Sequence, residues 1–148
     1  MKNIETKLNE LGYTLPAPWP PGKLERGVRV GNLVFTSGAG SQIQGKLGDN
    51  LDTESGYKAA RECGLQLLAN LKTVIGDLDN VVRIVKLLCM VNSAPDFTDQ
   101  PAVANGCTDL LIELFGEKAG KHARSAVGMA SLPGGIAVEI EMIVEVSS

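Results

Sequence analysis

The stretch ARSAVGMASLPGGIAVEIEMIVEV, residues 123–146, decides the fold of this 148-residue chain. Two runs with strand character flank Gly134-Gly135, and this pair suits a two-residue hairpin turn because glycine tolerates positive φ. The sequence therefore predicts a C-terminal hairpin in which Arg124 lies opposite Glu145.

The predicted hairpin has one apolar face and one face of small and charged residues, because side chains alternate along a strand. The apolar face is typical of a core and carries Val127, Met129, Val138, Ile140, Met142, Val144 and Val146. The other face carries Arg124, Ala126, Gly128, Ala130, Ala137, Glu139, Glu141, Ile143 and Glu145. This second face is either solvated or packed against another subunit.

The residues before this stretch predict the rest of a small α+β sandwich. We expect a hairpin over residues 27–37, a loop over 38–52, a helix from Asp52 or Thr53 to about Ile75, a strand over 81–91 and a second helix over roughly 100–115. The order is β-β-α-β-α-β-β, which forms a mixed sheet with the two helices on one face.

The first 21 residues look like an extension of this core. Apolar spacing predicts a short helix from Ile4 to Leu11, and Gly12 ends it. A Pro-rich arm follows in residues 15–22, where proline disfavours helix and sheet interior. The arm is either packed or loose, and Trp19 favours packing. We expect one domain over residues 1–148, with the extension in 1–21 and the core in 22–148.

Composition excludes several classes of function. The net charge is −3 and the basic residues are scattered, which argues against a nucleic-acid partner. No apolar run is long enough to span a membrane and no leader is evident, so we expect a cytoplasmic protein. Cys63, Cys89 and Cys107 are interpreted as reduced core thiols. His122 has no partner at metal-ligand spacing, so we expect no metal and no other cofactor.

The strand at residues 81–91 is apolar on both of its faces. Two helices on one face of the sheet would leave the other apolar side exposed in a monomer. Self-association is the simplest way to cover it.

Several motifs together resemble the RidA/YjgF family of reactive intermediate deaminases. They are Ala123-Arg124-Ser125, Leu132-Pro133 and Val138-Glu139-Ile140-Glu141, preceded by Gly27-Val28, Gly31-Asn32 and Phe35-Thr36-Ser37-Gly38 in the family's order. The resemblance spans roughly residues 22–146. It implies a chorismate-mutase-like fold, a homotrimer with clefts between subunits, and cofactor-free hydrolysis of enamines or imines of amino-acid metabolism to 2-oxo acids and ammonia.

The resemblance also implies roles for particular residues. Arg124 would bind the carboxylate of a small substrate through its guanidinium fork; the alternative is a strand-end ion pair with Glu145 or a neighbouring acid. Glu139 would position or activate water, or else be an ordinary surface or interface carboxylate. Ser37 and Gly38 would line the cleft and hydrogen-bond the substrate, or else cap a strand end.

The predicted hairpin separates Arg124 from Glu139 by six residues along the strands, roughly 20 Å. One small substrate could not bridge them within a chain. If both residues act on one molecule, they must come from different subunits.

Two departures from the family pattern favour an alternative function. Leu24 stands where the family commonly has tyrosine, and Ala126 stands where it commonly has cysteine. Trp19 or Tyr13 from the arm could fill the space that the tyrosine leaves. The alternative is a non-catalytic trimer that binds a small carboxylate and acts as a regulator or interaction module.

Overall fold

Helices and strands alternate along the chain much as the sequence predicts, in a computed structural model that describes residues 3–148. In chain order the elements are α1 (Ile4–Glu10), β1 (Gly27–Val30), β2 (Leu33–Thr36), β3 (Ala39–Gly40), α2 (Thr53–Ile75), β4 (Val81–Asn92), α3 (Gln100–Gly120), β5 (Ala123–Met129) and β6 (Val138–Val146). Asp52 caps α2 by accepting the Ser55 N–H, which fixes where this helix begins.

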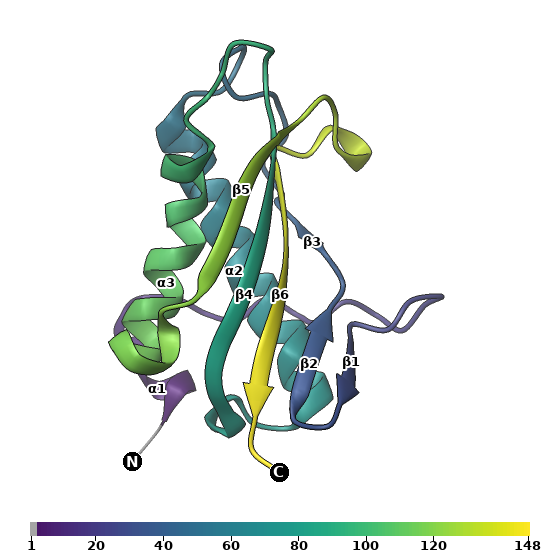
Figure 1. Ribbon diagram of the computed structural model, residues 1–148, viewed down its shortest axis with the longest axis vertical. Helices are drawn as coiled ribbons and strands as arrows, with labels where there is room; N and C mark the ends of the chain where they lie inside the picture. The colour runs from purple at the N-terminus through teal and green to yellow at the C-terminus, as the bar shows by residue number, and fades with distance from the viewer. Residues whose placement is uncertain (1–2) are drawn as a thin grey trace.

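The expected α+β class is confirmed. Helices α2 and α3 cover one face of a single mixed sheet, and the opposite face carries no helix within the described residues (Figure 1). The sheet order is β1-β2-β6-β4-β5, and the short β3 also pairs with β6. Strands β4 and β5 are parallel, with α3 as the crossover between them, and the other pairs are antiparallel.

The predicted pairing of the last two strands is wrong. Strand β4 lies between β5 and β6, so these two strands do not form a hairpin. The glycine turn itself is present, since Gly134 and Gly135 have φ of 67° and 71° and the Ile136 N–H donates to the Pro133 carbonyl. The turn connects two strands that are not neighbours in the sheet. The apolar strand β4 lies between them.

The helix-facing side of the sheet forms the core. From β4 and β6 it takes Val81, Ile84, Leu87, Cys89, Val91, Val138, Ile140, Met142, Val144 and Val146, all buried. Irregularities in the β4–β6 register lie between Val81 and Arg83 and between Ile84 and Lys86. The second lets both Ile84 and Leu87 face the helices, although their sequence separation is odd.

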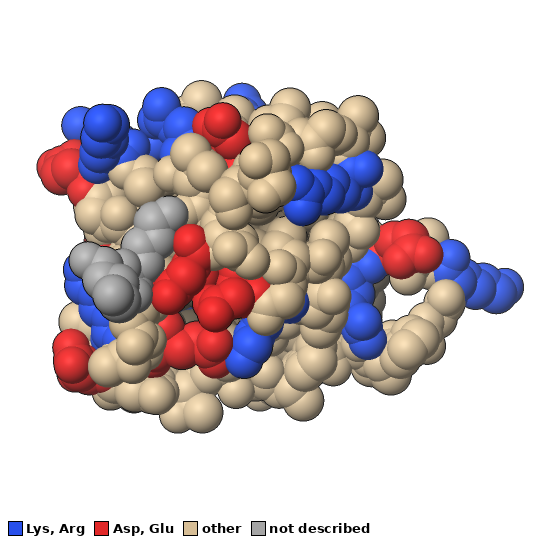
Figure 2. Space-filling view, turned by 90° about the horizontal axis from the view of Figure 1, so that it is seen from below, with Lys and Arg blue, Asp and Glu red and all other residues tan. Residues whose placement is uncertain are grey.

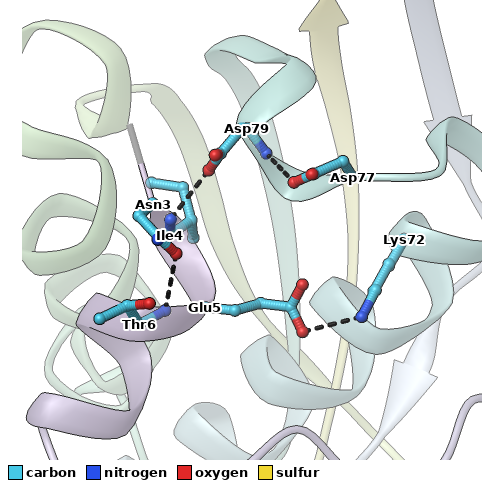
Figure 3. A network of polar contacts seen from close by, with 7 residues as sticks. All are labelled: Asn3, Ile4, Glu5, Thr6, Lys72, Asp77 and Asp79. Carbon is cyan, nitrogen blue, oxygen red and sulfur yellow. Dashed lines mark hydrogen bonds and ion pairs between the residues drawn. The ribbon is translucent and has the colours of Figure 1, made fainter. Parts of the chain in front are cut away.

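Helix α1 docks against the 3-10 turn Leu78–Asn80, which precedes β4, and against the end of α2 through polar contacts (Figure 3). Glu5 forms a 2.8 Å ion pair with Lys72 of α2, and the Ile4 N–H donates to Asp79 Oδ1 at 2.8 Å. The side chain of Asn3 caps the helix by accepting the Thr6 N–H. Leu8 is buried beneath these contacts, so the extension is part of the folded body.

The Pro-rich arm is packed. The Trp19 N–H donates to Asn70 Oδ1 at 3.0 Å, and Gln66 Nε2 donates to the Ala17 carbonyl at 3.1 Å. The Tyr13 ring lies 5.4 Å from the guanidinium carbon of Arg61. Past these contacts the chain before β1 projects from the side of the molecule (Figure 1).

The open face of the sheet is partly apolar, as expected. Its exposed hydrophobic residues are Val28, Val30, Leu33, Phe35 and Val127. Leu88 and Met90 of β4 lie on the same face and are half-buried. The charged residues of β6, including Glu139 and Glu141, share it.

Candidate functional site

Arg124 lies on β5 and points toward helix α3. It is level with Leu87 of β4, a buried residue of the helix-facing side. Its Nη1 donates to Asn105 Oδ1 at 2.8 Å and to Thr108 Oγ1 at 3.0 Å, and both acceptors belong to α3. These two bonds use both hydrogens of Nη1.

The charge of Arg124 is not neutralised by any carboxylate of residues 3–148. The alternative ion pair with Glu145 is wrong, because Glu145 is level with Leu33 and Arg83 on the opposite face. The Nε and Nη2 hydrogens of Arg124 form no hydrogen bond within the described residues. This edge of the guanidinium matches the two oxygens of a carboxylate.

Glu139 lies on the open face, in a hollow of about 410 Å³ beside β2 and the projecting segment before β1. Ser37, Gly38, Leu24 and Trp19 line the same hollow. Gly38 is in direct contact with the glutamate, since a Cβ there would collide with the carboxylate oxygen Oε2. The absence of a side chain at Gly38 therefore makes room for the Glu139 carboxylate.

Ser37 contributes less hydrogen-bonding capacity than expected. Its hydroxyl donates to the Glu25 carbonyl at 2.6 Å and its N–H donates to the Arg26 carbonyl at 3.1 Å. Both donors thus hold the segment before β1 in place, as a strand-end cap would. The Oγ lone pairs remain able to accept a hydrogen bond.

The prediction that Arg124 and Glu139 share one sheet face is wrong. Arg124 pairs with Leu87 and, like it, faces the helices. Glu139 pairs with Met90 and Gly40, and its side chain lies on the open face. The two Cα positions differ by three residues along the strands, about 10 Å, and by two strands across, about 10 Å. Within one chain the sheet separates the two side chains, so one small molecule cannot touch both.

The thiols near Arg124 do not offer a nucleophile. Cys89 and Cys107 are buried and free, as expected. Burial raises the pKa of the Cys89 thiol to about 12 and raises that of the Cys107 thiol as well. Both thiols are protonated at neutral pH, and a thiol is a much weaker nucleophile than a thiolate.

Several residues of this region were not anticipated. Arg26 lines the Glu139 hollow, and its Nε donates to the Trp19 carbonyl. Asn105 and Thr108 are three residues apart on α3, so helical spacing could have placed them side by side. Nothing local to either residue indicates a contact with Arg124.

Of the two arm residues suggested as substitutes for the family's tyrosine, one lies near Leu24 and the other does not line this hollow. Trp19 lines the hollow together with Leu24, which is 79% exposed. Tyr13 instead packs beneath Arg61 on α2.

Residues 3–148 contain no group of three or more His, Cys, Asp or Glu side chains placed to hold a metal ion. None of their helices combines the length and the apolar character that crossing a membrane requires.

Comparison with known proteins places this sheet and its two helices in a recognised class. The family described as Endoribonuclease L-PSP matches residues 14–146. This chain belongs to that family, which is the RidA/YjgF family, and the chorismate-mutase-like fold expected from the resemblance is confirmed.

Relatives in this family carry different names. The chain is 42% identical over 152 residues to Protein TCP17 of Trypanosoma cruzi, covering 98% of this chain and 95% of the relative. It is 33% identical over 130 residues to a 2-iminobutanoate/2-iminopropanoate deaminase of Dermatophagoides farinae, covering 86% and 89%. The crystal structure of protein Atu1372 from Agrobacterium tumefaciens superposes with a TM-score of 0.90 at 38% identity, covering 97% and 92%.

Proposed function

We propose that this protein hydrolyses small enamine or imine intermediates of amino-acid metabolism to 2-oxo acids and ammonia. The observation that carries the proposal is the unneutralised guanidinium of Arg124, whose Nε and Nη2 edge forms no hydrogen bond within residues 3–148 while α3 holds Nη1. The deaminase name of the mite relative supports the same chemistry.

The proposed reaction needs a carboxylate anchor and a base. Arg124 binds the substrate carboxylate and fixes the position of the C=N carbon. A water molecule attacks that carbon while Glu139 accepts a proton from the water. Glu139 passes that proton to the nitrogen, which gives a tetrahedral carbon carrying OH and NH2. The hydroxyl proton then moves to the nitrogen as the C–N bond breaks, so nitrogen leaves as ammonia and the carbon keeps the water oxygen as a carbonyl. An enamine first takes a proton on carbon and releases one from nitrogen, which gives the imine.

We further propose that the site is shared between subunits of a homotrimer. Arg124 and Glu139 face opposite sides of the sheet, so a second copy must bring its Glu139 hollow to the Arg124 of the first. The exposed apolar residues of the open face, among them Phe35 and Val127, give such an assembly a surface to bury. The trimer and the residue roles are both part of the proposal.

A nuclease activity, which the family description names, is less well supported by this chain. Its net charge is −3. Lysine and arginine are scattered on the face seen in Figure 2 and do not form one basic surface. A phosphate backbone is usually bound by clustered cations.

The test is hydrolysis of 2-iminobutanoate generated in the cuvette by an amino-acid oxidase, with release of 2-oxobutanoate measured against the uncatalysed rate. We expect acceleration by the wild type and almost none by Arg124→Ala or Glu139→Gln. Arg124→Lys should recover little, because an ammonium group cannot present two parallel donors. Wild-type protein that binds 2-oxobutanoate without accelerating hydrolysis would instead be a non-catalytic binder, the alternative function.

A further inference from the structure

A chain of hydrogen bonds lies behind Arg124 and ends at the only histidine of the protein, His122. Thr108 Oγ1 lies 3.0 Å from Arg124 Nη1 and 3.1 Å from His122 Nε2. The other ring nitrogen, Nδ1, lies 2.7 Å from the Gly120 carbonyl oxygen. The three side chains come from α3, from β5 and from the turn between them.

The direction of each bond follows from which groups can donate. A carbonyl oxygen only accepts, so His122 Nδ1 must carry a hydrogen. In the neutral ring Nε2 is then an acceptor, and the Thr108 hydroxyl donates its single hydrogen to it. The Thr108 oxygen is left to accept from Arg124, which can only donate.

The surroundings favour the neutral ring that this order requires. Burial of the ring is the largest effect and lowers the pKa of His122; the hydrogen bond to the Gly120 carbonyl opposes it in part, and the positive charge of Arg124 lowers the pKa further. A protonated ring would put a second donor on the Thr108 oxygen and leave the hydroxyl hydrogen without its acceptor.

We propose that Thr108 and His122 are positioning residues for the carboxylate site, with neutral His122 orienting the Thr108 hydroxyl so that it holds Nη1 of Arg124. This inference rests on the proposed role of Arg124. The held guanidinium turns its Nε and Nη2 edge toward the ligand and loses less rotational freedom on binding. His122 contacts neither ligand nor reacting atoms and acts only through Thr108.

The first measurement is nitrogen NMR of the free protein at pH 7.5. One histidine gives one imidazole signal pair, so assignment is direct. We expect the hydrogen on Nδ1, which is the less common tautomer. A hydrogen on Nε2 would overturn the inference whether or not any ligand binds.

The second measurement is the dissociation constant for 2-oxobutanoate by calorimetry. Thr108→Val removes the hydroxyl at constant shape and should weaken binding about tenfold, the range of a hydrogen bond to a charged group. Thr108→Ser should restore binding to within about twofold. Thr98→Val, an exposed threonine before α3, is the matched control and should change nothing.

The double variant identifies the route through which His122 acts. His122→Phe should weaken binding several-fold in a wild-type background and have no further effect in Thr108→Val, because residues that act as one unit are not additive. Additive losses, or wild-type affinity in Thr108→Val, would overturn the positioning role while leaving the proposed function intact. If wild-type protein binds no 2-oxobutanoate, the carboxylate site itself fails, and the positioning role fails with it.

Discussion

Gly38 illustrates how a single residue can shape the candidate site. The carboxylate of Glu139 occupies the position that a Cβ at residue 38 would need. This relation cannot be read from the Thr-Ser-Gly motif, where the glycine looks like an ordinary strand terminus. The motif indicates which residues lie together at the site. The sheet register explains why Gly38, one of them, has no side chain.

Gly38→Ala should displace the Glu139 carboxylate and slow imine hydrolysis by about tenfold to a hundredfold, the usual cost of misplacing a reacting group by about 1 Å. The melting temperature should change little, because Glu139 lies at the edge of an open hollow. Gly22→Ala is the matched control, since a Cβ there meets no atom within 4 Å. Equal rates for the two variants would show that the position of Glu139 does not limit the reaction.

His122 should make stability depend on pH. Its pKa is lowered in the folded protein, so between that value and the unfolded value of 6.5 the unfolded chain binds more protons. The contribution of the neutral ring is complete above pH 6.5 and is lost as the pH falls through the folded pKa.

Urea unfolding at pH 7.5 and pH 5.5, at one protein concentration, would measure this effect. Wild type should lose more unfolding free energy than His122→Phe over that interval. An identical loss in both proteins would contradict the assignment of His122 as a neutral, half-buried ring.

At the scale of elements, local patterns predicted most of the structure. Apolar spacing and the Asp52 cap predict α2. The predicted end of the second helix near residue 115 coincides with a break at Gly116, which has φ 82° and ψ 170°, but the chain is helical again up to Gly120. These features depend on neighbours within a few residues. The prediction that β5 pairs with β6 is wrong because a Gly-Gly turn can also connect two strands that have a third strand between them.

The crossing of α2 and α3 depends on small residues. Gly106 of α3 lies against the backbone carbonyl of Tyr57, and Gly64 of α2 faces the side chains of Cys107 and Leu110. A methyl group on Gly106 would have to push a backbone aside, whereas one on Gly64 meets side-chain atoms at 3.0 Å that can move slightly.

Gly106→Ala should therefore lower the unfolding free energy by about 1–3 kcal/mol, the range for overpacking, even though alanine favours the helix by about 1 kcal/mol. Gly64→Ala should cost clearly less. Urea unfolding of the two variants checks the order, and a more stable Gly106→Ala protein would show that the helices can separate freely at this crossing.

At the scale of the whole molecule, the proposal of a shared site does not depend on the distance that the predicted hairpin implied. The hairpin geometry was incorrect, yet Arg124 and Glu139 still cannot meet within one chain because the sheet lies between them. The sheet face on which each of these side chains lies depends on the strand order, in which β4 separates β5 from β6. Strand order is a property of the complete sheet.

Mixing two inactive variants tests the shared site. Arg124→Ala and Glu139→Gln proteins are dissociated, combined and allowed to reassociate, and every mixed trimer should contain one interface with both original residues. Activity should therefore return in part. Light scattering checks that trimers form, and mixed trimers no more active than either parent would contradict the shared site.

The place of β6 inside the sheet also has a consequence for biosynthesis. Strand β6 is the last strand of this domain to leave the ribosome, yet it joins β2 on one side to β4 on the other. Until it arrives, β1-β2 and β4-β5 are separate ribbons with no hydrogen bonds between them, and Val34 and Leu87 lack the partners that bury them. The nascent chain can form its helices early, but closure of the sheet must follow release of residues 138–146, so chaperone protection matters most in that interval.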